Sequence, residues 1–135
     1  MTLSIISPDK KILETDCLQV TVPTTTGIIT ILPHHTPLYS LLAPGDVIVK
    51  SDHKSDTLVV NSGFVAVAKN KVTLLTDFGI RLEEIDEEII KEAKQRAEKA
   101  MADKVSEEQF TTNKAELFKA LLQLNAVKRH KSKTL

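Results

Sequence analysis

The chain has 135 residues, of which 41% are hydrophobic and 27% are charged. This apolar content is enough for the core of one domain, or of a small domain with an appendage, and it excludes a disordered chain. Lysine plus arginine and aspartate plus glutamate both number 18, so there is no net charge to favour nucleic acid or an anionic membrane surface as a partner.

The start of the chain predicts neither targeting nor membrane insertion. Residues 1–11 lack the basic start and long apolar segment of a signal peptide, and the first arginine is Arg81, which argues against an Arg-rich transit peptide. No apolar run approaches the roughly 20 residues of a spanning helix, so we expect no direct lipid insertion. Cys17 is the only cysteine, which excludes an internal disulfide and favours a small buried hydrophobic residue.

Residues 1–82 have the pattern of a β domain. All four glycines and all five prolines lie in this part, between short runs rich in Val, Ile, Leu and Thr. Short strands separated by regular turns predict an antiparallel sandwich or barrel, without long crossover helices between parallel strands. The predicted strands are 3–7, 18–22, 27–32, 47–50, 57–61, 64–68 and 72–76.

Two of these strands carry the most detailed expectations. In "CLQVTVP" the residues Leu18, Val20 and Val22 alternate with polar residues, so all three should face the core. The apolar run at 27–32 is interpreted as a core strand that ends at a loop.

That loop, "PHHTPL", holds the most conspicuous polar pair of the chain. Adjacent residues on an extended chain point to opposite sides, so His34 and His35 should not bind one metal together. Pro33 and Pro37 stiffen the loop and keep it out of a regular ladder. A displayed loop is favoured, with a histidine-based enzyme as the less favoured alternative.

The pattern changes near residue 82. Residues 1–82 hold 7 basic and 7 acidic side chains, whereas the shorter segment 83–135 holds 11 of each. We therefore divide the chain into domains 1–82 and 83–135. Asp86 is a predicted N-cap, and a stripe of small residues follows it along one predicted helix. That stripe is Ile89, Ala93, Ala97 and Ala100.

A second helix should begin at about Glu107. Ser106 with Gln109 three positions later is a capping-box pattern. The stripe of this helix is Phe110, Leu117, Leu121 and Leu124, flanked by Ala120 and Val127. Two such helices joined by a short polar turn predict an antiparallel hairpin. Small side chains bury little apolar area, so the hairpin should be marginal alone and suited to switching between docked states.

Motifs for chemistry are absent from the sequence. The four glycines are too far apart for a phosphate-binding loop, and no G-x-S-x-G nucleophile motif occurs. The acidic cluster "EEIDEE" fits the start of a helix better than a carboxylate site. We expect no catalytic residues, no metal and no cofactor.

The order of these features resembles a known family. The segments "LSIISPDKKI", "VTVPTTTGIITILPHHTPLYSLLAPGDVIV", "LVVNSGFVAVAKNKVTLLTD", "IDEEIIKEAKQRAEKA" and "KAELFKALLQLNAV" together resemble the epsilon subunit of F-type ATP synthases, called delta in mitochondria. The likeness covers nearly the whole chain. It implies a ten-stranded sandwich followed by a helical hairpin.

The resemblance also implies a function and partners. The chain would be a non-catalytic subunit of the rotor stalk, bound to gamma and to the ring of c subunits, coupling ion flow to ATP synthesis. The family's loop contact to the c ring falls on Pro33, His35 and Thr36. Members often carry an acidic residue at the place of Ile28, so the polar contact expected there is lost.

For the hairpin, the resemblance implies regulation. The family's nucleotide pattern keeps Ile85, Asp86 and Arg96 here, but a family arginine is replaced by Ile89, so we expect weak or no ATP binding. A hypothesis of inhibition places Lys119, Lys128 and Arg129 against acidic residues of the alpha and beta catalytic subunits.

The expected location is the cytoplasmic face of the bacterial inner membrane, as a peripheral subunit, with an organelle-encoded copy as the other possibility. A different class stays open from the residues alone. The chain could be a free-standing sandwich that binds some other protein through its hairpin, and co-purification with gamma separates these readings.

Overall fold

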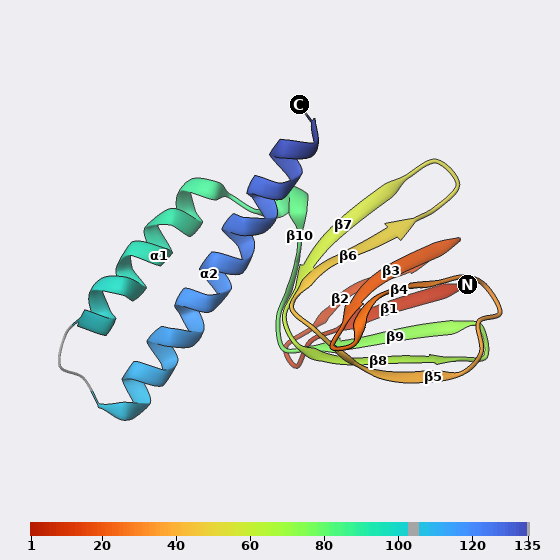
Figure 1. Ribbon diagram of the computed structural model, residues 1–135, viewed down its shortest axis with the longest axis horizontal. Coiled ribbons are helices and arrows are strands. Elements are labelled where there is room, and N and C mark those ends of the chain that lie inside the picture. The colour runs from red at the N-terminus through yellow and green to blue at the C-terminus, as the bar shows by residue number, and fades with distance from the viewer. Residues whose placement is uncertain (103–105, 135) are drawn as a thin grey trace. The chain divides into compact units, whose positions relative to one another are not determined.

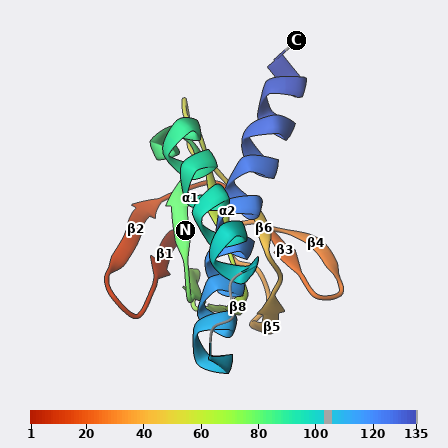
Figure 2. The ribbon, with the colours of Figure 1, turned by 90° about the vertical axis from the view of Figure 1, so that its left-hand side faces the viewer.

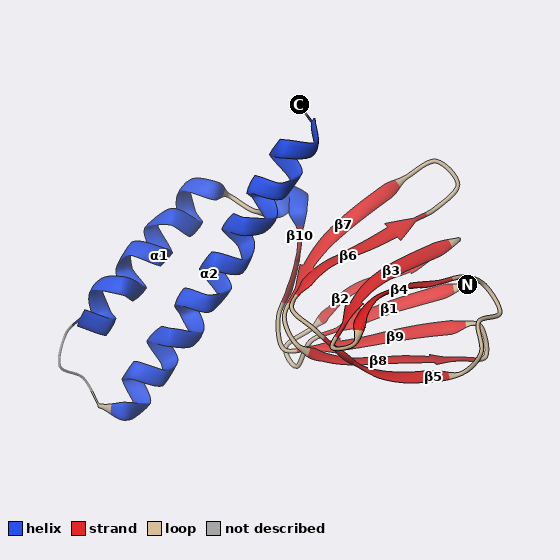
Figure 3. Ribbon diagram, viewed as in Figure 1, coloured by secondary structure: helices blue, strands red, loops and turns tan. Residues whose placement is uncertain are grey.

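The computed structural model describes residues 1–102 and 106–134, which form two compact units, Met1–Glu83 and Glu84–Leu135. The first unit is built of strands and the second of helices (Figures 1 and 3). The elements in chain order are β1 (Thr2–Ile6), β2 (Lys11–Asp16), β3 (Gln19–Thr24), β4 (Gly27–Ile31), β5 (Leu38–Leu42), β6 (Gly45–Lys50), β7 (Ser55–Val60), β8 (Gly63–Ala68), β9 (Lys71–Thr76), β10 (Gly79–Arg81), a short 3₁₀ turn (Leu82–Glu84), α1 (Glu87–Ala102) and α2 (Glu107–Thr134).

The ten strands form one continuous sheet that folds over on itself. Its order is β10-β7-β6-β3-β5-β8-β9-β1-β2, and β4 pairs with β3 outside this path. β3 and β5 share one residue pair, Thr24 with Leu42, and this short pairing marks the corner between the two layers. At the opposite corner, a Cβ on Gly79 of β10 would lie 2.9 Å from Cδ1 of Ile12 in β2. The predicted sandwich is therefore confirmed.

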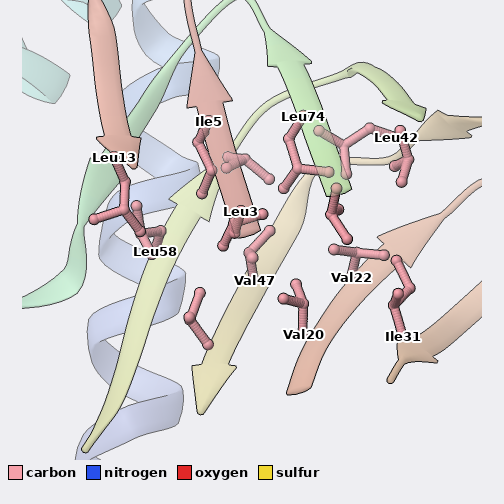
Figure 4. Packing of buried hydrophobic residues seen from close by; sticks show 14 of the residues in the cluster. Leu3, Ile5, Leu13, Val20, Val22, Ile31, Leu42, Val47, Leu58 and Leu74 are labelled. Atoms are coloured by element: carbon pink, nitrogen blue, oxygen red, sulfur yellow. The ribbon is translucent and has the colours of Figure 1, made fainter. Parts of the chain in front are cut away.

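The core lies between the two layers and consists of alternate residues from nearly every strand (Figure 4). Alternation places one face of a strand inward, so each of β1 to β9 contributes branched aliphatic side chains to a single apolar cluster, whereas β10 contributes none. Val20 and Val22 are fully buried, as predicted, and so is Leu74 on the other layer. Cys17 belongs to the same cluster, which agrees with its interpretation as a buried hydrophobic residue.

One strand pair is parallel. β1 pairs with β9 in parallel and with β2 in antiparallel register, whereas the other pairs are antiparallel. No helix lies between β1 and β9 in the sequence, because the intervening strands carry the chain back to the β1 edge.

Three strands were not among those predicted from the sequence: β2, β5 and β10. β2 carries three exposed charged residues, Lys11, Glu14 and Asp16, which weaken the apolar signal of "KILETD". β5 has large apolar side chains on both faces, so it lacks a clear alternation, and β10 has only 3 residues.

Two detailed expectations for the sandwich are wrong. Leu18 does not face the core with Val20, because it precedes β3 and its side chain is 52% exposed. The run 27–32 is not a core strand throughout, because β4 pairs with β3 alone and its outer side faces solvent. In β4, Ile31 is fully buried, whereas Ile28 is 77% exposed.

The second unit is the predicted hairpin, in which α1 and α2 lie side by side in Figure 1 and α1 lies in front of α2 in Figure 2. Oδ1 of Asp86 accepts hydrogen bonds from the amides of Glu88 (3.1 Å) and Ile89 (3.3 Å), which confirms it as the N-cap of α1. Oγ of Ser106 accepts from the amide of Gln109 at 3.3 Å, and α2 begins at Glu107 as predicted. The expected turn residues 103–105 lie outside the described residues.

The predicted helix stripes need partial correction. On α1, Ala97 is buried as expected, but Ile89 is exposed and Ile90 is half-buried. On α2, Ala120 and Leu124 are buried as expected. Phe110 and Leu121 are exposed, which was not expected. The buried side of α2 includes a polar residue, Gln123, in their place.

Candidate functional site

The histidine loop is built around a tight turn. The amide of His35 donates to the carbonyl of Leu32 at 3.2 Å, and His34 has a φ of 64°. A positive φ at the third residue and proline at the second are the features of a type II turn, and here Pro33 fills the second place. The sequence therefore fixes this loop through proline, whereas His34 occupies a position that favours glycine or asparagine.

Asn70 attaches this loop to the rest of the sandwich. Its side-chain Oδ1 accepts a hydrogen bond of 2.9 Å from the amide of His34, and its own carbonyl accepts from the amide of Thr2 at 3.2 Å. Lys69 and Asn70 both have positive φ, as in the two-residue hairpin turn that joins β8 to β9. The loop, the β8–β9 turn and the start of β1 therefore meet at one end of the sandwich (Figure 1).

The two histidines have different roles in this loop. His34 contributes its backbone amide to the anchor, whereas the ring Nδ1 of His35 lies 2.7 Å from the carbonyl oxygen of Thr36. A carbonyl only accepts, so Nδ1 carries the hydrogen and Nε2 is left for a partner. Both side chains are exposed, and so are Pro33 and Thr36. The loop thus presents its side chains to solvent.

Ile28 lies away from this loop. It stands near the start of β4, and Leu32 follows the other end of the strand, about 13 Å further along at about 3.3 Å per residue. Ile28, Thr30 and Leu32 all face outward, and we call these three residues the β4 strip. The structure brings Pro33, His35 and Thr36 together and joins them to Ile28 through this strip.

A second exposed apolar surface lies on the other layer. Leu41 of β5, Phe64 of β8 and Leu75 of β9 are paired in register across three strands, and all three are exposed. Tyr39 is 84% exposed on the same side of β5. We call these four residues the apolar face. Contiguous exposed apolar groups of this kind mark protein interfaces.

The apolar face continues into a shallow groove. The groove has a volume of about 460 Å³ and is lined by Ile6, Pro8, Gly63, Phe64 and Leu75, among others. At Gly63, one of its lining residues, β8 and β9 approach closely, since an added Cβ would lie 1.8 Å from the carbonyl oxygen of Leu75. This face is not among the sites predicted from the sequence. The sequence does contain a pattern that could have predicted it: two consecutive apolar residues occur in each of β5, β8 and β9, and such pairs place large side chains on both sides of a strand.

The candidate nucleotide residues lie along α1 without converging. Asp86 caps the helix, Ile85 precedes it half-buried, and Arg96 is exposed ten positions beyond Asp86. At 1.5 Å per residue this separation is about 15 Å along the axis. Asp86 is surrounded by further carboxylates, Glu87 and Glu88, at the helix start.

The candidate inhibitory cations do not share one face of α2. Lys119 and Lys128 are nine positions apart, and at about 100° per residue they project from opposite sides of the helix. Arg129 follows Lys128 on a third side, and both are exposed. Lys119 is half-buried, and its carbonyl accepts from Nε2 of Gln123 at 3.4 Å.

Sites for chemistry do not emerge from the described part of the chain. Among residues 1–102 and 106–134 no cluster of three or more His, Cys, Asp or Glu side chains is arranged to hold a metal. Cys17 is buried, and desolvation raises the pKa of its thiol, which disfavours the nucleophilic thiolate. In the same part of the chain, the helices lack the length and apolar character needed to cross a membrane.

Family models match both units. The model described as the ATP synthase delta/epsilon chain beta-sandwich domain matches residues 1–81, and the model described as the ATP synthase delta/epsilon chain long alpha-helix domain matches residues 83–128. The two models therefore divide the chain as the structure does, into a β-sandwich followed by a helical domain. The chain belongs to the ATP synthase delta/epsilon family.

Individual relatives agree with this assignment. The chain is 37% identical over 134 residues to the ATP synthase epsilon chain of Dichelobacter nodosus, covering 94% of both chains. It is 34% identical to the ATP synthase epsilon chain of Nitrosococcus oceani, covering 98% of this chain and 96% of the relative. The suspected resemblance is confirmed, and a sandwich unrelated to this family is no longer supported.

Solved structures share the fold at lower identity. A chain in the Euglena gracilis mitochondrial ATP synthase, in a structure of its OSCP/F1/c-ring, matches with a TM-score of 0.64 and 24% identity, covering 98% of this chain and 80% of that one. A chain from the central stalk/c-ring of the Tetrahymena thermophila mitochondrial ATP synthase matches with a TM-score of 0.61 and 17% identity, covering 94% and 96%.

Proposed function

We propose that this chain is a non-catalytic subunit of the central stalk of an F-type ATP synthase, where it couples ion movement through the c ring to ATP synthesis. Family membership over both units supports this proposal. So do the assemblies in which its structural neighbours occur, the central stalk and c ring. The chain would act by binding, since stalk coupling needs a rigid connection and no bond chemistry in this subunit.

The observation that carries the proposal is the apolar face. Leu41, Phe64 and Leu75 would cost solvation free energy if left exposed, at about 25 cal/mol per Å² of apolar surface. A permanent partner that covers them removes this cost. We assign the apolar face to the gamma subunit and the histidine loop, with the β4 strip, to the c ring.

The test is co-purification of gamma with the full chain. Phe64→Glu should abolish capture of gamma, because it places an unpaired charge in the centre of the contact. Ser55→Glu adds the same charge at an exposed position at the start of β7 and should leave capture intact. Equal capture by both variants would contradict the assignment of the face, and absence of capture by the unmodified chain would contradict the stalk function.

The location follows from the same proposal. A stalk subunit belongs to a membrane-associated complex, and we place it at the cytoplasmic face of a bacterial inner membrane as a peripheral subunit. Similarity to epsilon chains from bacteria such as Dichelobacter nodosus supports the bacterial placement. Fractionation should recover the chain with membranes and release it together with the soluble ATPase sector.

For the hairpin we propose weak or no ATP binding. Arg96 lies along α1 far from the capped start at Asp86, and the carboxylates of Glu87 and Glu88 repel phosphate. Calorimetry on the full chain tests this. Micromolar ATP affinity that is lost in Arg96→Ala would overturn it.

We also propose that the hairpin inhibits ATP hydrolysis by contacting the alpha and beta subunits. Lys128 and Arg129 are consecutive in the sequence and exposed near the end of α2, and each projects from its own side of the helix, where acidic residues of the alpha and beta subunits could reach them. Removal of residues 83–135 should then raise hydrolysis by the assembled complex while gamma is still bound. Unchanged hydrolysis with gamma bound would remove the inhibitory role and leave the stalk function in place.

A further inference from the structure

The covered side of α2 contains a polar side chain whose hydrogen-bonding groups are poorly satisfied. Gln123 is only 6% exposed. Its Nε2 donates to the carbonyl of Lys119 at 3.4 Å, whereas its Oε1 is buried without a hydrogen-bond partner in the described part of the chain. A glutamine amide oxygen can accept two hydrogen bonds. Both acceptor positions of Gln123 therefore lack a protein partner.

The side-chain bond that Gln123 does make adds little. The carbonyl of Lys119 is four positions earlier in α2, so in a regular α-helix it already accepts the backbone amide of Gln123. A separation of 3.4 Å is also long for an N–H···O bond. Because water satisfies a glutamine amide fully, burial of Gln123 costs free energy that an apolar side chain of the same shape would not cost.

The opposite side of α2 leaves large apolar side chains in solvent. Phe118 is 46% exposed and Leu121 is 36% exposed. At about 100° per residue, they project about 140° and 160° away from Gln123. The covered residues beside Gln123 are mostly small: Ala120, Leu124 and Ala126. A packing of α2 that covered Phe118 and Leu121 in place of Gln123 would remove more apolar surface from water.

The packing of α2 along α1 that the structure shows is called here the docked position of α2. We infer that Gln123 holds α2 near balance between this docked position and a released position in which water satisfies the Gln123 amide. Burial of Ala97, Ala120 and Leu124 favours docking, and the unpaired Oε1 of Gln123 opposes it. Two states of similar free energy are what a conformational switch requires, so Gln123 makes release of α2 easy.

The test is native-state hydrogen exchange of the full chain, followed by NMR for individual amides. Gln123→Met keeps the unbranched shape and the helix propensity of glutamine but removes Oε1. Exchange of α2 amides through release should then slow by about tenfold. Amides of β8 and β9 belong to the other compact unit and should keep their wild-type rates. Unchanged or faster exchange of α2 amides in Gln123→Met would overturn the inference.

Gln95→Met is the matched control. It makes the same chemical change at an exposed position of α1, where no buried acceptor is removed. Exchange of α2 amides in this variant should stay within about twofold of the wild type. Slowing of the same size in both variants would show that the apolar character of methionine, and not the buried oxygen of Gln123, is responsible, and this result would also overturn the inference.

The same variants test regulation in the assembled synthase, and this measurement rests on the proposed inhibitory role of the hairpin. Release frees α2 to contact the alpha and beta subunits, so Gln123→Met should raise ATP hydrolysis toward the level of a complex without residues 83–135, whereas Gln95→Met should not. If removal of residues 83–135 raises hydrolysis and Gln123→Met does not, Gln123 is not the regulatory position. If that removal leaves hydrolysis unchanged, the inhibitory role fails, and the exchange rates alone decide whether Gln123 controls release.

Discussion

The amide of His34 donates a 2.9 Å hydrogen bond to the side-chain oxygen of Asn70, 36 positions further along the chain. Both residues have left-handed backbone, with φ of 64° and 60°. Two turns that are strained for ordinary residues are thus joined to each other, and together they hold the histidine loop at the end of the sandwich.

Asn70 should be difficult to replace by residues other than aspartate. Asn70→Ala loses the acceptor, at about 1 kcal/mol, and adds left-handed strain of about 1 kcal/mol, so unfolding free energy should fall by about 2 kcal/mol. Asn70→Asp keeps an acceptor and tolerates this backbone, so it should stay near the wild type. Urea unfolding of both variants measures the difference, and equal stability would contradict the anchor.

His34→Gly should stabilise the chain. Glycine takes a φ of 64° without steric cost and keeps the amide that binds Asn70, so relief of strain should exceed the entropy that glycine gains on unfolding, leaving about 0.5 kcal/mol. The control is His35→Gly, whose backbone has no positive φ and should become less stable. A destabilised His34→Gly would show that the turn is not strained.

Gly63 should tolerate no side chain. The added carbon of Gly63→Ala would lie 1.8 Å from the carbonyl oxygen of Leu75, so β8 and β9 must separate. We expect a loss of about 3 kcal/mol in unfolding free energy, together with weaker gamma capture, because the apolar face is distorted. Gly45→Ala meets only Pro23 side-chain carbons, at 3.2 and 3.3 Å, and should lose about 1 kcal/mol or less. A Gly63→Ala chain as stable as Gly45→Ala would disprove the close approach.

Glu14 should titrate below its ordinary range. Its carboxylate accepts a 2.9 Å hydrogen bond from Nζ of Lys11, and this bond, followed by the charge of Lys11, lowers the pKa of Glu14. Because the pKa of Glu14 is lower in the folded chain than in the unfolded chain, ionised Glu14 stabilises the fold. This stabilisation is present at pH values above the unfolded-state pKa and is lost as the pH falls through the folded-state pKa. In an NMR titration, Lys11→Met should raise the pKa of Glu14 more than Lys71→Met does. The opposite ranking would show that Lys11 is not the main cause.

The sequence was sufficient where one local rule decides the structure. Alternation identified Val20 and Val22 as core residues, and the helix starts at Asp86 and Ser106 followed from side chains that accept amide hydrogen bonds. The family resemblance extended this outline to ten strands.

The sequence was insufficient where neighbours in space decide whether an apolar residue is buried or exposed. Leu18 and Ile28 have the same apolar character as core residues, but one lies before its strand and the other on an edge strand, and periodicity does not record either fact. Tyr39 and Phe64 form a surface only because β5 and β8 pair in a given register. Ile89 and Ile90 are adjacent in sequence, and only helix packing decides which of them is covered.

Coupling in the stalk is measured as ATP-driven proton or sodium pumping into vesicles by the synthase of the same organism, first stripped of this subunit and then given back the full chain. We expect stripping to uncouple hydrolysis from pumping and the full chain to restore pumping. The Ser55→Glu chain should also restore pumping, whereas the Phe64→Glu chain should not. Pumping that is equal with and without the chain would contradict a coupling role in the stalk.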